Sequence, residues 1–189
     1  MEKRSFLVSS TLVLAGFAVL AFNSCTKLAK NLQYDLDMQT ASVDITIPPY
    51  ADTSITVAGS QTTNYNIDSF IKANTGNVLG VSNISSAKLK TCVLTLHGAT
   101  QTLNFANFKS CSGSLYSASN LDPYTVTIAN NPDVYSTSLD LPVDPDKELK
   151  GYLANSNQFT YSLGGKLRRP TTDSIHCTAT FTFKVHVQG

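Results

Sequence analysis

Apolar and polar residues alternate along most of the chain after residue 33, with a period of two instead of the 3.6 of a helix. The longest run is 174–187, where Ile, Cys, Ala, Phe and Val occupy one set of positions and His, Thr and Lys occupy the other. Such alternation is typical of a strand in an antiparallel sheet with one buried and one solvated face. The pattern therefore predicts an all-β chain.

Shorter alternating runs, separated by turn-forming residues, predict the other strands. The expected strands are 34–38, 43–47, 54–58, 78–81, 88–97, 103–108, 115–117, 124–129, 135–141, 158–167 and 174–187. Because only a short turn separates 88–97 from 103–108, these two are expected to form a hairpin. Two short helices are also expected, one over 67–72 after an N-cap at Asn66, and one over 147–154.

Composition agrees with this pattern, since charged residues make up only 14% of the chain and Thr, Val, Ile, Tyr and Phe are frequent. We expect one domain over 33–189, an antiparallel β-sandwich of immunoglobulin-like or jelly-roll-like type, with about eight to ten strands and two short helices. Segments 53–97 and 137–187 share the order strand, short helix and strand around a cysteine. This likeness is compatible with two related halves and also with chance.

The first 25 residues follow a different pattern. Lys3 and Arg4 precede an apolar run over 6–21, and small or polar residues follow it as far as Cys25. This is the layout of a secretory signal peptide, and the run is shorter than the roughly 20 residues that span a bilayer comfortably. Export is the prediction, with an uncleaved membrane anchor as the alternative.

The ending Phe22-Asn23-Ser24-Cys25 resembles the signal of bacterial lipoproteins, in the loose form found in Bacteroidota. The resemblance implies that residues 1–24 are removed, that Cys25 is lipidated and that 25–32 is a tether. Several acyl chains would anchor the protein stably, at about 0.8 kcal/mol per buried CH₂. The chain has no acidic residue between Cys25 and Asp35. The resemblance therefore implies the periplasmic face of the outer membrane, with the cell surface as the alternative.

The net charge and the absence of known catalytic motifs argue against some classes of function. The whole chain has a net charge of +1, which the leader residues Glu2, Lys3 and Arg4 account for, so the chain from Cys25 onward is neutral. A neutral chain has no electrostatic footprint for nucleic acid. The sequence has no Gly-x-Ser-x-Gly elbow, Walker loop or paired-carboxylate site, so neither an enzyme nor a cofactor is expected.

These observations predict a membrane-anchored envelope lipoprotein that acts as a non-enzymatic binding or structural module, with a protein or a glycan as its partner. One alternative is a carbohydrate-binding lipoprotein, whose sugars would stack on exposed tyrosines because the chain has no tryptophan. The candidate tyrosines are Tyr50, Tyr65, Tyr116, Tyr124, Tyr135 and Tyr152. Another alternative is a carrier of an apolar ligand held inside the fold.

Three cysteines follow Cys25, and an exported protein sits where disulfides form. Cys92 and Cys111 flank the expected hairpin, so their pairing is the first expectation. Cys92 with Cys177 is the second, since both point to the core face. Three free thiols are the third, because a buried free cysteine packs as a small hydrophobe. The sequence leaves these alternatives open.

No metal site is expected. Asp140, Asp144, Asp146 and Glu148 form an acidic run with the oxygen ligands that calcium prefers, but a turn followed by a helix N-terminus explains it better. His176 and Cys177 are adjacent on a strand, so their side chains point to opposite faces and do not suit zinc.

Two further short motifs lie near the C-terminal strand. The triplet Asp173-Ser174-Ile175 resembles the O-glycosylation sequon of Bacteroidota, which implies modification of Ser174. Lys166, Arg168 and Arg169 form a small basic cluster that is expected at a solvated hairpin tip.

Overall fold

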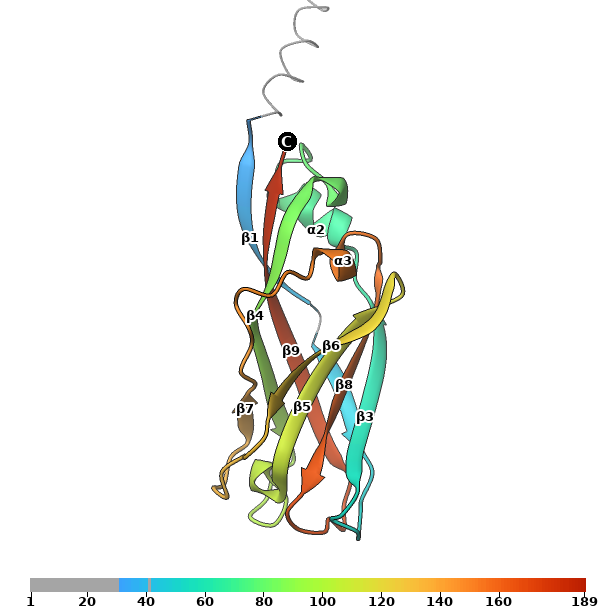
Figure 1. The fold of residues 1–189 in the computed structure, drawn as a ribbon, viewed down its shortest axis with the longest axis vertical. Helices are drawn as coiled ribbons and strands as arrows, with labels where there is room; N and C mark the ends of the chain where they lie inside the picture. The colour runs from blue at the N-terminus through green and yellow to red at the C-terminus, as the bar shows by residue number, and fades with distance from the viewer. Residues whose placement is uncertain (1–30, 41) are drawn as a thin grey trace, which may run out of the picture.

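A computed structural model describes residues 31–40 and 42–189. The strands are β1 (Gln33–Gln39), β2 (Val43–Ile47), β3 (Thr56–Asn64), β4 (Ile84–His97), β5 (Phe108–Ser117), β6 (Asn120–Ile128), β7 (Ser138–Asp140), β8 (Gln158–Leu167) and β9 (Ile175–Gln188). The helices are α2 (Ile67–Asn74) and α3 (Lys150–Leu153), with 3₁₀ turns η1 (Val81–Asn83) and η2 (Phe105–Asn107). The strands form two antiparallel sheets packed face to face (Figure 1).

The order of the strands defines the topology. The first sheet runs β1–β9–β4–β7, with β2 also paired to β9, and the second runs β3–β8–β5–β6. If β1 and β2 are counted as one interrupted edge strand, this is the arrangement of a jelly roll. The predicted all-β sandwich with two short helices is confirmed, and its topology is the jelly-roll alternative.

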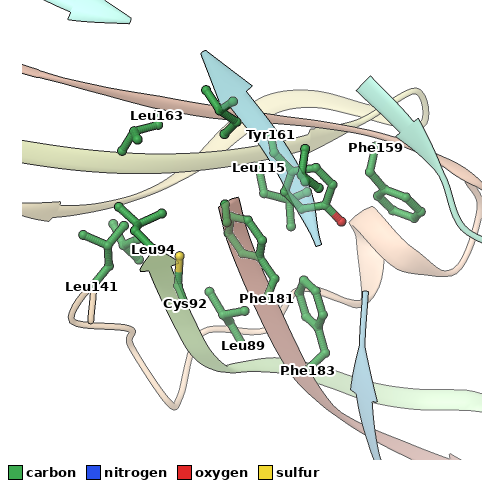
Figure 2. Close-up of a cluster of buried hydrophobic side chains, with 14 of the residues drawn as sticks. Leu89, Cys92, Leu94, Leu115, Leu141, Phe159, Tyr161, Leu163, Phe181 and Phe183 are labelled. Carbon is green, nitrogen blue, oxygen red and sulfur yellow. The ribbon is translucent and has the colours of Figure 1, made fainter. Parts of the chain in front are cut away.

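The best-patterned stretch of the sequence lies in the middle of the first sheet. β9 pairs with β1 and β2 on one side and with β4 on the other, in a register from Ile84 opposite Val187 to His97 opposite His176. Its alternation buries Phe181 and Phe183 between the sheets, and Figure 2 shows both beside apolar side chains of the second sheet. Burying such a side chain contributes about 1.5–3 kcal/mol, so these positions fix the register.

Two sequence-level details are confirmed. The first edge strand is interrupted between β1 and β2, and both parts pair with β9, at Gln39 opposite Thr182 and Val43 opposite Ala179. Helix α2 begins where expected, because the Asn66 side chain accepts a hydrogen bond from the Ser69 N–H at 2.9 Å.

The expected hairpin between 88–97 and 103–108 is wrong, because β4 and β5 lie in different sheets. The chain between them crosses from one sheet to the other through η2. The side chain of Asn104 stabilises this turn by accepting a hydrogen bond from the Ala106 N–H at 2.9 Å. The expected strand 78–81 is also wrong, since the chain there enters the 3₁₀ turn η1.

The two ends of the sandwich differ. Both ends of the described chain lie at one end, where Gln33 of β1 pairs with Gln188 of β9 (Figure 1). The connections at the opposite end, which we call the distal end, are 48–55, 98–107, 129–137 and 168–174. The predicted signal peptide and Cys25 lie outside the described residues. In the described part of the chain, no helix has the length and apolar character needed to cross a membrane.

Candidate functional site: the distal loops

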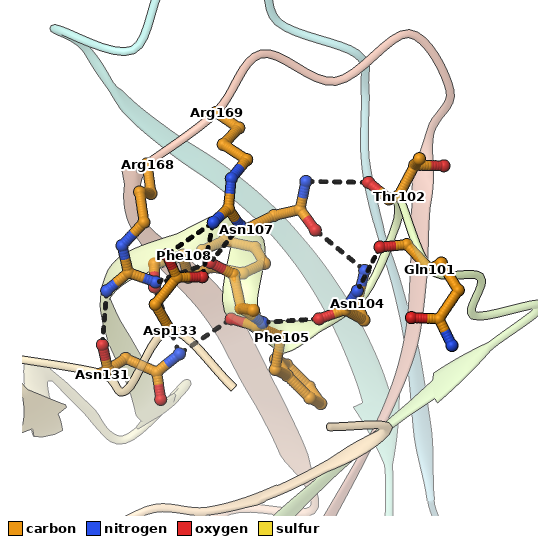
Figure 3. Close-up of polar contacts among 11 residues, drawn as sticks. Gln101, Thr102, Asn104, Phe105, Asn107, Phe108, Asn131, Asp133, Arg168 and Arg169 are labelled. Atoms are coloured by element: carbon orange, nitrogen blue, oxygen red, sulfur yellow. Dashed lines mark hydrogen bonds and ion pairs between the residues drawn. The ribbon is translucent and has the colours of Figure 1, made fainter. Parts of the chain in front are cut away.

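Arg168 ties together three of the distal connections. Its Nη1 donates to the Ala106 carbonyl at 2.7 Å and its Nη2 donates to the Asn131 carbonyl at 2.6 Å (Figure 3). Its backbone N–H donates to the Asn107 carbonyl, also at 2.6 Å. One residue that follows β8 thus holds the β4–β5 and β6–β7 connections, which fixes their relative positions.

Asn131 reinforces this arrangement from within. Its side chain is buried, and its Nδ2 donates to the carbonyls of Phe105 at 2.8 Å and Phe108 at 3.1 Å. Its backbone N–H donates to the Lys109 carbonyl at 2.8 Å. These bonds satisfy buried carbonyl groups that would otherwise be costly to leave unpaired. The distal loops are therefore organised before any ligand arrives.

The neighbouring Arg169 plays a different part. Its Nη2 donates to both carboxylate oxygens of Asp133, at 2.6 and 2.5 Å, at the surface of the β6–β7 loop. The hydrogen bond from Arg169 lowers the pKa of Asp133. Both side chains are about half exposed, at 51% and 48%, so the pair remains accessible from solvent.

A groove of about 500 Å³ opens beside this ion pair. It is lined by Gln101, Thr102, Asn104, Ala106, Asn107, Asp133, Tyr135, Arg169 and Pro170. The buried amides of Asn104 and Asn107 are engaged in loop hydrogen bonds, so Gln101, Tyr135 and the ion pair are the groups of the lining that remain available for contacts.

Exposed apolar side chains gather around the same end. Of the five large hydrophobic residues that are exposed in the described chain, Ile55, Val134 and Tyr135 lie in distal connections. Val134 is 68% exposed beside Asp133. Tyr135 and Arg169 line one groove at this end, and tyrosine and arginine are the residue types that interface hot spots favour.

The tyrosines proposed for sugar stacking do not form a row. Tyr135 is the only one of the six candidates that is classed as exposed. Tyr152 is buried and donates its hydroxyl to the Asp122 carbonyl at 2.8 Å. Tyr124 is half-buried, and its hydroxyl oxygen accepts from the Asp144 N–H at 3.4 Å.

Cys92, Cys111 and Cys177 lie in the core and are free. Cys92 and Cys111 are not bridged, because the hairpin that would have paired them does not form. They belong to opposite sheets, in β4 and β5, and the Cys92 thiol packs beside Gly113 of β5, where a Cβ would lie 3.7 Å from its Sγ. Cys92 of β4 is paired with Phe181 of β9, whereas Cys177 of β9 is paired with Leu96 of β4. The two cysteines are therefore four residues, or about 13 Å, apart along the strands. Burial raises the pKa of each thiol to about 12.

The acidic residues considered as calcium ligands make separate contacts. Glu148 accepts from the Ser86 hydroxyl at 2.6 Å and from the Ala87 N–H at 2.8 Å, while Asp146 pairs with Lys88 at 3.4 Å. Asp140 lies in β7, and Asp144 accepts from the Asp146 N–H. Within 31–40 and 42–189, no group of three or more His, Cys, Asp or Glu residues is arranged to hold a metal.

Ser174 is half-buried immediately before β9, and its glycosylation stays a prediction. Nothing in the sequence indicated the part played by Asn131 and Asp133, since they lie among turn-forming residues between the expected strands 124–129 and 135–141. It also placed Arg168 in solvent, whereas its guanidinium is the centre of the loop network. The long-range partners of these residues have no signature in the local pattern.

No family model matches the chain, and no curated protein is similar to it. Several solved structures are similar over most of its length. A structure of infectious bursal disease virus (Gt strain) aligns with 85% of this chain over 34% of its own chain, at 10% identity and a TM-score of 0.39. A decameric BFDV capsid protein aligns with 84% of this chain and over 100% of its own length, at 11% identity and a TM-score of 0.38. TmCBM61, in complex with β-1,4-galactotriose, aligns with 83% of this chain and over 88% of its own length, at 5% identity and a TM-score of 0.30. Such scores say nothing about function.

Proposed function

We propose that this protein is a non-enzymatic binding module of the bacterial cell envelope, tethered by lipid on Cys25 and engaging a partner protein through its distal loops. The observation that carries the proposal is that the two ends of the sandwich differ. The described chain begins at one end of the sandwich, and the organised loops with their exposed apolar side chains lie at the other (Figure 1). A tether at the amino end would therefore present the distal loops away from the membrane.

The composition and rigidity of the distal end support a protein partner. Val134 and Tyr135 offer apolar contact area, and the Arg169–Asp133 pair offers directional polar groups beside them. Loops that are already held by Arg168 and Asn131 lose little conformational freedom on binding, which favours affinity. The engaged distal surface would then consist of the β6–β7 loop and its neighbours.

Photo-crosslinking in cells tests the binding surface. A photoreactive residue at position 134 should give a discrete crosslinked product, while the same residue at position 121 should give none. Leu121 is a matched control, because it is also highly exposed, at 73%, but lies outside the distal loops. In the protein labelled at 134, Tyr135→Ser should reduce the product severalfold. Equal crosslinking from both positions would refute the distal surface.

Fractionation tests the tether separately. The variant Cys25→Ala should move the protein from the membrane fraction to the soluble fraction, because the acyl chains would be lost. A variant that stays with the membrane would contradict the lipid anchor. It would leave the crosslinking result at position 134 unaffected, so the two parts of the proposal can fail independently.

A glycan partner is the second candidate, and the groove beside Tyr135 is the observation that favours it. An exposed aromatic ring at the rim of a polar groove of about 500 Å³ suits a neutral sugar. Tyr135→Ala should then abolish binding on an array of neutral oligosaccharides. An apolar carrier lacks comparable support, because the two distal grooves and the groove beside His97 and His176 are open and carry polar side chains.

A further inference from the structure

A second groove lies on the other side of Arg168, at the distal end of the outer face of the second sheet. Its volume is about 570 Å³. It is lined by Thr53, Ser54, Lys109, Asn130, Asn131, Lys166, Leu167 and Arg168. These residues come from β5, β8 and the β2–β3, β6–β7 and β8–β9 connections, so the groove depends on the complete fold.

A β-bulge lies at the two lysines of this groove. Phe108 pairs with Leu167, but the next register pair is Ser110 with Lys166, which leaves Lys109 as the extra residue. The bulge sets Ser110 opposite Lys166 and leaves Lys109 outside the ladder beside this pair, and both lysines line the groove. Gly165 makes room for the bulge, because a Cβ there would lie 2.1 Å from the Ser110 carbonyl oxygen.

The groove is basic and rich in hydrogen-bond donors. Lys109 and Lys166 are exposed, and neither forms an ion pair with another described residue. Arg168 also lines the groove, but its guanidinium is paired with Asp133 at 3.6 Å, so the two lysines supply the uncompensated charge, and no acidic residue is among the lining. Ser54 contributes a hydroxyl group, while its own N–H donates to the nearby Asp52 carboxylate at 2.7 Å.

We infer that this groove binds an acidic polysaccharide through its sulfate or carboxylate groups. Lysine ammonium groups pair with such oxyanions as compact charges, and the Ser54 hydroxyl and the exposed Asn130 amide suit the sugar hydroxyls between them. No aromatic side chain lines the groove, so nucleobases would find no stacking platform. The volume falls within the roughly 300–1,000 Å³ of small-ligand sites, enough for a short saccharide segment. The inference does not rest on the proposed protein partner.

Binding of the full-length protein in detergent to immobilised dextran sulfate and polygalacturonate tests the inference, with neutral dextran as the blank. Dextran sulfate supplies sulfate groups and polygalacturonate supplies carboxylates, so a signal on either supports the site and identifies the anion. Binding should weaken as salt rises. The double variant Lys109→Gln/Lys166→Gln should lower affinity about tenfold, the equivalent of about 1.4 kcal/mol.

The control is Lys147→Gln/Lys150→Gln, which removes the same charge from two exposed lysines near α3 and should leave the affinity unchanged. Val134→Ser should also leave it unchanged, because that residue belongs to the other distal surface. Loss of affinity in the control equal to that in the test variant would overturn the site. So would absence of binding to both polymers, or equally tight binding of single-stranded DNA.

Discussion

Arg168→Gln should destabilise the protein far more than the same change at its neighbour Arg169. Two charge-assisted hydrogen bonds from the Arg168 guanidinium, to carbonyls of two different loops, would be lost. The Arg168 side chain is 25% exposed, whereas Arg169 is 51% exposed and bonds chiefly to a surface carboxylate. Both arginines also reach the other's partner, Arg168 pairing with Asp133 at 3.6 Å and Arg169 donating to the Ala106 carbonyl at 3.4 Å. The two substitutions change charge identically, so their difference chiefly reports the shorter bonds of Arg168 to the two loops.

The expected size follows from these contacts. A hydrogen bond to a charged group contributes about 1.5–3 kcal/mol to stability, and water that enters the loops would replace part of what is lost. We expect Arg168→Gln to lower the free energy of unfolding by about 2–3 kcal/mol. Arg169→Gln should cost less than about 1 kcal/mol, as exposed ion pairs do. Arg168→Lys should fall between them, because it keeps the charge but loses the planar fork.

Urea unfolding, followed by far-UV circular dichroism and tyrosine fluorescence, measures these differences. With a slope of about 2 kcal/mol per molar urea, Arg168→Gln should shift the midpoint down by about 1–1.5 M. The slope itself should not change, since the surface exposed on unfolding is the same. Equal midpoints for the Arg168 and Arg169 variants would refute the assignment of Arg168 as the organiser of the distal loops.

Two further changes test the sheets. Gly165→Ala should lower the free energy of unfolding by about 1–3 kcal/mol, because the new Cβ would collide with the Ser110 carbonyl. Gly151→Ala is the control and should be nearly neutral in the same urea assay, because the nearest atom to its new Cβ is 3.9 Å away. Burial alone would raise the pKa of Glu148, but hydrogen bonds from the Ser86 hydroxyl and nearby backbone N–H groups lower it overall from 4.5. Its stabilising contribution is therefore present above pH 4.5 and lost as pH falls through the lowered pKa, so thermal melts of wild type and Glu148→Gln should converge in acid.

Local patterns predicted much of the fold. The alternation over 174–187 and the run ending at His97 correspond to β9 and β4, since their apolar positions form the buried face of the first sheet. The N-cap at Asn66 was also predictable, because its hydrogen bond spans only three residues. Each of these features depends on neighbours in the sequence, which is where periodicity and capping rules apply.

Contacts between distant segments were not predictable in the same way. Chain proximity favoured a hairpin between 88–97 and 103–108, but burying both apolar faces places β4 and β5 in opposite sheets. The pairing of β4 with β9 sets His97 directly opposite His176, although 79 residues separate them. The distal site was missed for the same reason, since Arg168 meets Ala106 and Asn131 only after both sheets have formed.

The interrupted edge strand has a mechanical consequence. β1 and β2 pair antiparallel with β9, and β9 begins at the distal end while β1 begins at the opposite one. With the amino end held at a membrane and a ligand pulling on the distal loops, the two strands would be drawn in opposite directions along their length. Such a load shears the ladder and stretches all of its hydrogen bonds at the same time. The pairing of β1 and β2 with β9 would therefore also resist force on the tether.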